Sequence, residues 1–168
     1  EITSIQELKD IQPIGEHHPW IEQQIKVVKE IRSHFHEEIA SFYNIFSPIS
    51  YLKRWFRTDQ SRGDQVIATF LKEDPGTLAH VLDVIAGDIA ILSHRLIQEA
   101  GVEGIYFSTQ QVQDERVTEE EYRKFIEPSS IAVLEAANEA GGINILHICG
   151  FEGASNEVEL FKDYPAQV

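Results

Sequence analysis

Three short, largely apolar runs rich in β-branched and aromatic residues alternate with longer segments of helical periodicity along this chain. The runs occupy residues 39–46, 104–109 and 143–149, and helical patterns at 75–99 and 119–140 separate them. Apolar strands that alternate with helices are typical of parallel sheets whose faces are covered by those helices. The sequence therefore predicts an α/β fold built from parallel βαβ units.

Residues that typically start or end helices flank the two helical patterns. Asp74 precedes a Pro and is a candidate N-cap, and Gly101 stands where a C-terminal cap is expected. Thr118 and Glu121 have the spacing of a capping box. Pro128 predicts a break in the helix that starts there, followed by a second helical segment.

The length of the chain limits the architecture. A helical pattern at 19–35 precedes the first run, and residues 164–168 have the pattern of a further strand that is beginning. A closed (β/α)8 barrel typically needs about 250 residues. We therefore expect residues 1–168 to form a single domain that is part of a larger TIM barrel. The sequence contains no methionine, even at position 1, which leads us to expect a longer natural protein.

Composition bears on partners and location. The 28 acidic and 14 basic residues give a net charge of −14, which repels nucleic acid and anionic membrane surfaces. No stretch reaches about 18 uninterrupted apolar residues, and no signal-peptide pattern opens the sequence. A single cysteine excludes an internal disulfide framework and fits a reducing compartment. We expect a cytoplasmic protein with no nucleic-acid or membrane partner.

His147 and Cys149 stand two residues apart at the end of the third run. Alternate side chains of a strand share a face, with Cα atoms roughly 6.5 Å apart. Imidazole nitrogen and thiolate sulfur are both zinc ligands, and a thiolate favours zinc over magnesium or calcium. The spacing predicts two ligands of one zinc ion. The alternative is a buried cysteine beside a histidine that is hydrogen-bonded in the core.

Polar residues also follow the ends of the first two runs, where a βα barrel carries its chemistry. The candidates for substrate binding are Ser47, Tyr106, Ser108 and Gln110. Tyr106 and Phe107 point to opposite sides of their strand, so one is expected in the core and the other at the mouth of the barrel. The residue types assign no catalytic acid, base or nucleophile.

A small basic cluster follows the first run. It consists of Lys53, Arg54 and Arg57. Such a cluster fits an anionic group of a substrate, and it fits a solvated helix face equally well.

Four segments resemble the uroporphyrinogen decarboxylase superfamily, which contains haem-pathway decarboxylases and corrinoid-linked methyltransferases. These segments are residues 46–48, residues 101–110, Phe125 with Pro128, and residues 146–150. The resemblance extends from about residue 20 to the end of the chain. It implies a (β/α)8 barrel whose N-terminal portion and last strands lie outside these 168 residues.

Within this superfamily, the methyltransferases hold zinc with a His-x-Cys pair and a later Cys, and His147 and Cys149 match the pair. The resemblance thus implies transfer of a methyl group from a corrinoid, or a similar donor, to a thiol that zinc activates. Because no second Cys is present, the third ligand is expected outside the chain or at Glu152. The implied partners are a small-molecule thiol, a corrinoid protein and a second copy of the chain in a homodimer.

The decarboxylase branch is the alternative. Its members act in porphyrin biosynthesis and bind a tetrapyrrole with eight carboxylates, without a cofactor, through an early Arg-rich segment, an Asp, a Tyr and a Ser. The Arg-rich segment has no counterpart here, and Ser108 lies near the strand end where the Ser is expected. A non-catalytic protein that binds a tetrapyrrole is the second alternative.

Overall fold

The computed structural model describes residues 2–35, 39–56, 60–150 and 155–168. The elements, in order, are η1 (Ile5–Leu8), α1 (Pro19–Phe35), β1 (Phe42–Phe46), α2 (Pro48–Trp55), α3 (Gln60–Glu73), α4 (Pro75–Ala100), β2 (Gly104–Thr109), α5 (Glu119–Phe125), α6 (Glu127–Glu139), β3 (Ile145–Ile148) and η2 (Val158–Phe161). The helices η1 and η2 are short 3₁₀ helices.

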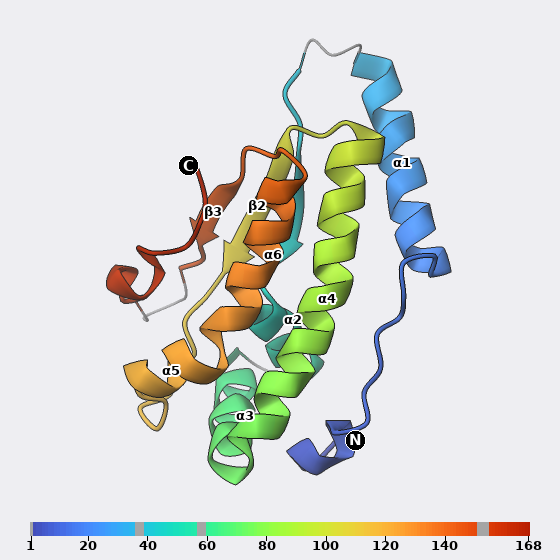
Figure 1. Cartoon of the computed structure of the whole chain (residues 1–168). Coiled ribbons are helices and arrows are strands. Elements are labelled where there is room, and N and C mark those ends of the chain that lie inside the picture. The colour runs from blue at the N-terminus through green and yellow to red at the C-terminus, as the bar shows by residue number, and fades with distance from the viewer. Residues whose placement is uncertain (1, 36–38, 57–59, 151–154) are drawn as a thin grey trace.

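Within the described residues, β1, β2 and β3 form a parallel sheet in the order in which they occur in the sequence (Figure 1). The register places Phe46 beside Ser108, and Ser108 beside His147. The helices α2, α3 and α4 connect β1 to β2, and α5 and α6 connect β2 to β3. The predicted α/β fold of parallel βαβ units is confirmed.

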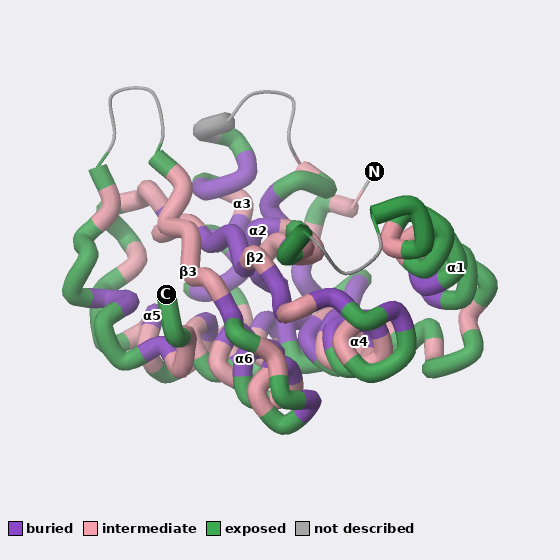
Figure 2. Tube along the Cα trace, turned by 90° about the horizontal axis from the view of Figure 1, so that it is seen from above, coloured by how far each residue is buried: buried purple, intermediate pink, exposed green. Residues whose placement is uncertain are grey.

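The core lies between the sheet and the layer formed by α4 and α6. The sheet residues Ile45, Ile105 and Phe107 are fully buried and belong to one hydrophobic cluster with residues of both helices. Figure 2 shows buried residues in this layer, whereas α1 is exposed over much of its surface. Phe107 is the core residue and Tyr106 is half-buried on the opposite face, as the alternation of the strand predicts.

The helix α4 is the longest element and the centre of the helical layer. Asp74 caps it by accepting a hydrogen bond from the backbone N–H of Thr77, and Gly101 ends it with a positive φ of 73°. By length and composition, α4 is the one helix among the described residues that could cross a membrane. Here it packs against α6 and α1 as a core helix, and the Asp88 carboxylate accepts hydrogen bonds from the N-terminal segment.

The end of the chain adds to the outer edge of β3. The backbone N–H groups of Gln167 and Val168 donate to the Asn144 carbonyl, and Leu146 N–H donates to the Val168 carbonyl. This alternation is the pattern of a parallel ladder. It agrees with the expectation that a further strand begins near the end of the sequence.

Two helices, α2 and α3, are not apparent from the sequence pattern, which indicates only that Pro48 stops the first strand. Ser47 is the N-cap of α2 and Pro48 its first residue, so the Ser-Pro pair ends β1 and starts a helix at once. The strands β1 and β3 are also shorter than predicted, since they cover residues 42–46 and 145–148. The capping box of Thr118 and the break before Pro128 are as predicted.

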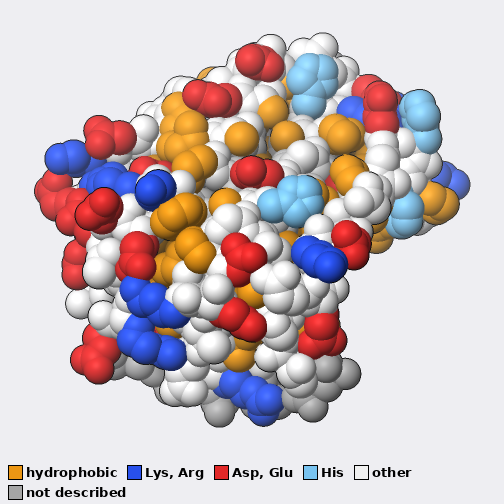
Figure 3. Space-filling view, turned by 60° about the horizontal axis from the view of Figure 1, so that its bottom comes forward, with side chains coloured by type: hydrophobic (Ala, Val, Ile, Leu, Met, Phe, Trp, Pro, Cys, Tyr) orange, Lys and Arg blue, Asp and Glu red, His pale blue; other side chains and the backbone are white. Residues whose placement is uncertain are grey.

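The net charge of −14 is spread over the surface. On the face that Figure 3 shows, acidic side chains lie among basic and apolar ones. Several acidic groups pair with cations on neighbouring helices, such as Glu121 with Lys72 and Glu99 with Lys29. The excess acidic side chains therefore do not form a single charged patch on this face.

Candidate functional site

The sheet face opposite the core carries the metal-capable side chains. The rings of Tyr106 and His147 lie side by side on it, with centroids 5.2 Å apart and planes tilted by 31°. The register sets Ser108 directly beside His147, and the Ser108 hydroxyl lies close to the Cys149 side chain. The structure therefore brings four of the predicted site residues together, with His147 and Cys149 both next to Ser108.

The Cys149 thiol is half-buried, and the backbone N–H and carbonyl of this residue are both hydrogen-bonded. Burial raises the pKa of the thiol, while the neighbouring Ser108 hydroxyl and the positive charge of Lys53 counteract that rise in part. The Cys149 N–H donates to the Thr109 carbonyl at 2.8 Å, and its carbonyl accepts from the Asn156 side chain at 2.7 Å. The thiol is protonated at neutral pH, and its backbone position is fixed.

Asn44 joins this face from β1 and was not singled out by the sequence. Its side-chain oxygen accepts a hydrogen bond from the Ser108 hydroxyl at 3.0 Å. Because Asn44 precedes Ile45 in an apolar run, the period-two alternation was the signal that could have identified it. Asn44 orients the hydroxyl that contacts Cys149.

Ser47 and Gln110 occupy the carboxyl end of the sheet in structural roles. The buried Ser47 hydroxyl accepts from Thr109 at 3.1 Å and is hydrogen-bonded to the Ser50 hydroxyl at 2.8 Å. The Gln110 side-chain oxygen accepts from the Lys53 ammonium at 3.2 Å. Neither contact tests a role in substrate binding, which stays a prediction for both residues.

The predicted basic cluster divides into residues with different surroundings. The Lys53 side chain is only 8% exposed, and its ammonium lies 2.5 Å from the carboxylate of Asp64, which is 2% exposed. Arg54 is exposed and stacks over the Phe46 ring at 4.5 Å. Arg57 lies outside the described residues. A solvated helix face is therefore wrong for Lys53, because α3 supplies a buried carboxylate to it.

The donor set on the open face fits part of a zinc site. An imidazole and a thiol are available at His147 and Cys149, which are nitrogen and sulfur ligands of the kind that zinc accepts. Among the residues that the structure describes, no group of three or more His, Cys, Asp or Glu side chains is arranged to hold a metal ion. Glu152, the predicted third ligand within the chain, lies outside the described residues.

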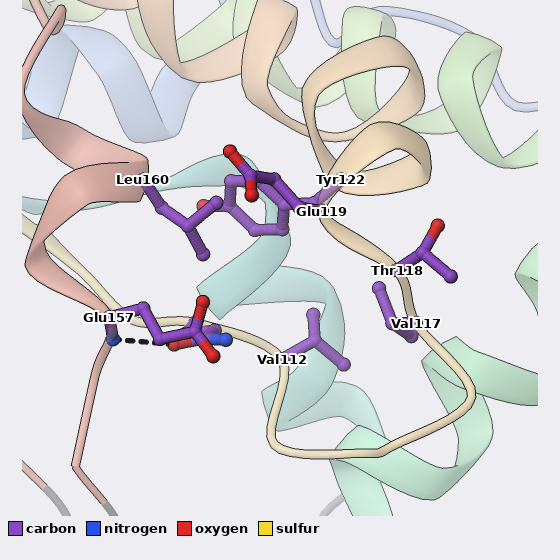
Figure 4. Close-up of a pocket in the computed structure, with 8 residues that line it drawn as sticks. Val112, Val117, Thr118, Glu119, Tyr122, Glu157 and Leu160 are labelled. Carbon is purple, nitrogen blue, oxygen red and sulfur yellow. Dashed lines mark hydrogen bonds between the residues drawn. The ribbon is translucent and has the colours of Figure 1, made fainter.

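A small cavity of about 60 Å³ lies between α5, η2 and the segment after β2 (Figure 4). The carboxylates of Glu119 and Glu157 border it, and the Glu157 backbone N–H donates to the Gln111 side chain at 2.8 Å. Tyr122, also in its wall, is hydrogen-bonded to Tyr164, and burial raises the pKa of the Tyr122 hydroxyl. The cavity is too small for an organic substrate, and none of Tyr106, Ser108, His147 and Cys149 lines it.

Comparison with protein families identifies the family of this chain. The family model for uroporphyrinogen decarboxylase (URO-D) matches residues 1–165. The chain belongs to the uroporphyrinogen decarboxylase family. No curated protein and no solved structure matches the chain.

Membership in the uroporphyrinogen decarboxylase family settles the architecture of the sheet. The fold of this family is a TIM barrel, so β1, β2 and β3 with their helices are part of a (β/α)8 barrel. The open face with His147 and Cys149 then corresponds to the inside of the barrel, and the ends of the strands correspond to its catalytic mouth. Membership also supports an enzymatic function, of decarboxylase or related methyltransferase type.

Proposed function

We propose that this protein is a methyltransferase that moves a methyl group from a corrinoid, or a similar donor, to a thiol bound at a zinc site containing His147 and Cys149. The observation that carries the proposal is the placement of both side chains beside Ser108 on the open sheet face. A nitrogen ligand on β3 and a sulfur ligand two residues later, just after the strand ends, suit zinc. Bound zinc would supply Lewis acidity that lowers the pKa of the acceptor thiol.

The residues around the pair have roles that follow from their contacts. The Tyr106 ring restricts rotation of the His147 imidazole, because the two rings pack at 5.2 Å. The Ser108 hydroxyl donates to Asn44, which fixes its position beside the Cys149 thiol. This arrangement orients both ligands before the metal binds, which lowers the entropic cost of binding.

The proposed transfer accounts for every atom and electron pair. The acceptor thiol loses its proton to solvent, and its sulfur forms a bond to the methyl carbon. The bond from the methyl carbon to the donor breaks, and its electron pair stays on the donor. The transfer therefore needs a methylated donor, a thiol and no external oxidant.

The first test is the zinc content of the protein purified without chelator, compared with His147→Ala and Cys149→Ala. We expect about one equivalent of zinc in the wild type and a large loss in both variants, because each removes one ligand. His94→Ala is the matched control, since His94 is exposed on α4 and remote from the site. The control is expected to retain the wild-type zinc content.

The second test is turnover with methylcobalamin and small thiols, measured as the thioether formed. Methyl transfer that fails in Cys149→Ala supports the proposal. Turnover of uroporphyrinogen by metal-free protein would instead assign the decarboxylase reaction. Tight binding of a corrinoid or tetrapyrrole with neither activity would assign a non-catalytic role.

We also propose a cytoplasmic location and a second copy of the chain as partner. The single cysteine, which fits a reducing compartment, supports the location. Equilibrium sedimentation of the purified protein measures the mass in solution. A mass equal to a single chain at micromolar concentration would contradict the dimer.

A further inference from the structure

The strongest unused feature of the molecule is the buried ion pair of Lys53 and Asp64. Both side chains are more than nine-tenths buried and belong to α2 and α3. The two helices approach closely there, because a Cβ atom at Gly63 would lie 2.8 Å from the Lys53 carbonyl oxygen. Burying two charges is costly unless geometry and further hydrogen bonds compensate, so the pair requires an explanation.

The ammonium of Lys53 also contacts the segment that follows β2. It donates to the Gln110 side-chain oxygen at 3.2 Å and to the Gln111 carbonyl at 3.3 Å. These contacts tie the end of β2 to α2 and, through Asp64, to α3. The ion pair therefore fixes the backbone at the carboxyl end of the sheet.

Gln111 continues the connection toward Cys149. The Gln111 N–H donates to the Asn156 side-chain oxygen at 3.0 Å, and its own side chain accepts from the Glu157 N–H, the contact drawn in Figure 4. The amide nitrogen of Asn156 in turn donates to the Cys149 carbonyl at 2.7 Å. A continuous series of hydrogen bonds thus joins the buried ion pair to the backbone of a proposed zinc ligand.

We propose that Lys53 is a positioning residue of the site, acting through Gln111 and Asn156 on the backbone of Cys149. This inference rests on the proposed function for its chemical purpose. The hydrogen bonds from which it is argued are those of the metal-free protein. Partners that orient a ligand without touching the metal typically change metal affinity by about 10- to 100-fold when they are lost.

The main test uses Lys53→Met combined with Asp64→Leu, because the single Lys53 variant would leave an uncompensated buried carboxylate and could unfold. The first measurement is hydrogen exchange in metal-free protein. We expect the Cys149 amide to exchange at least about ten times faster, and the Ile105 amide, bonded to Asn144, to stay unchanged. Equal acceleration at both amides would show a merely structural role and overturn the proposal.

The second variant is Asn156→Asp, which keeps the acceptor for Gln111 and removes the donor to Cys149. Its matched control is Asn138→Asp, which removes a donor to the Pro165 carbonyl at 2.7 Å. With cobalt(II) as the probe, we expect the thiolate-to-cobalt absorption to weaken and cobalt affinity to fall by about 10- to 100-fold in Asn156→Asp and in the double variant. The control is expected to keep both at the wild-type level.

The two proposals fail in different ways. If wild-type protein binds neither zinc nor cobalt, the methyltransferase proposal fails, and hydrogen exchange still decides whether Lys53 positions Cys149. If wild type binds cobalt, and both variants bind it with unchanged affinity and unchanged exchange at Cys149, the positioning role is wrong.

Discussion

At Gly104 the first residue of β2 passes close to the chain that enters β3. A Cβ atom built on Gly104 would overlap the carbonyl oxygen of Ile143, and the Ile143 N–H donates to the Glu103 carbonyl at 2.8 Å. Gly104→Ala is expected to destabilise the protein by about 2–3 kcal/mol, because backbone atoms must move apart. Urea unfolding measures the change.

The control for this prediction is Gly87→Ala, at an exposed position within α4 where a Cβ atom meets nothing within 4 Å. That substitution should stabilise the protein by about 0.5–1 kcal/mol, since alanine is the better helix former. A Gly104→Ala variant as stable as the wild type would show that the starts of β2 and β3 can separate without cost.

At the scale of single residues, the sequence predicted those site residues whose neighbours are close in sequence or are set by the alternation of side chains along a strand. His147, Cys149 and Tyr106 share the open face because of period-two alternation and parallel register. The contacts of Lys53 were not predictable in this way, since one of them is with Gln110, which lies 57 positions along the chain. Such a contact exists only once the helices have packed.

Among the elements, the start of α5 shows how local electrostatics depend on pH. The Glu121 carboxylate accepts from the Lys72 ammonium at 2.5 Å and from the Thr118 backbone and hydroxyl, which lower its pKa to about 2. Because the folded pKa lies below the ordinary value of 4.5, this stabilisation is complete above pH 4.5 and is lost as the pH falls through about 2. Glu121→Gln should lower the free energy of unfolding at pH 7 by about 1 kcal/mol, and the difference should vanish near pH 2.

Chemical denaturation of Glu121→Gln and wild type at several pH values between 2 and 7 measures this effect. Glu120→Gln is the control, because it changes the charge of the same helical turn at an exposed residue. A difference between Glu121→Gln and wild type that stays constant with pH would rule out the carboxylate as its origin.

Elements with strong end signals were predicted closely. Asp74 and Gly101 bound α4, and Thr118 with Glu121 starts α5, because caps satisfy backbone groups locally. The helix α2 escaped prediction because Ser47 and Pro48 serve two elements, ending a strand and starting a helix. The Ser-Pro pair was interpreted only as the end of the strand, so the start of the helix was missed.

For the whole molecule, the net charge of −14 predicts a dependence of stability on salt. Like charges spread over the surface repel one another, and this repulsion is screened at distances beyond about 8 Å at physiological ionic strength. The free energy of unfolding in urea should rise by about 1 kcal/mol between 10 mM and 500 mM sodium chloride. Potassium chloride serves as the control for ion identity, and a fall in stability with either salt would mean that ion pairs outweigh the repulsion.

At the same scale, alternating apolar runs and helical patterns were sufficient to predict the parallel sheet and its class. A third ligand for the proposed zinc ion could not be identified, because the sequence offers no second Cys and the described residues complete no cluster around His147. Fold class follows from periodic patterns along the chain, whereas a metal site needs convergence of residues from separate strands.

The match between strand order in space and order along the sequence also has a consequence for biogenesis. When β2 leaves the ribosome, β1 is already available to pair with it, and β3 later meets a completed β2. Among the three described strands, β2 and β3 each pair with the strand that precedes them, and neither has to insert between two others. The nascent chain can therefore bury each new strand edge as it appears, which shortens the time for which that edge could recruit another polypeptide and aggregate.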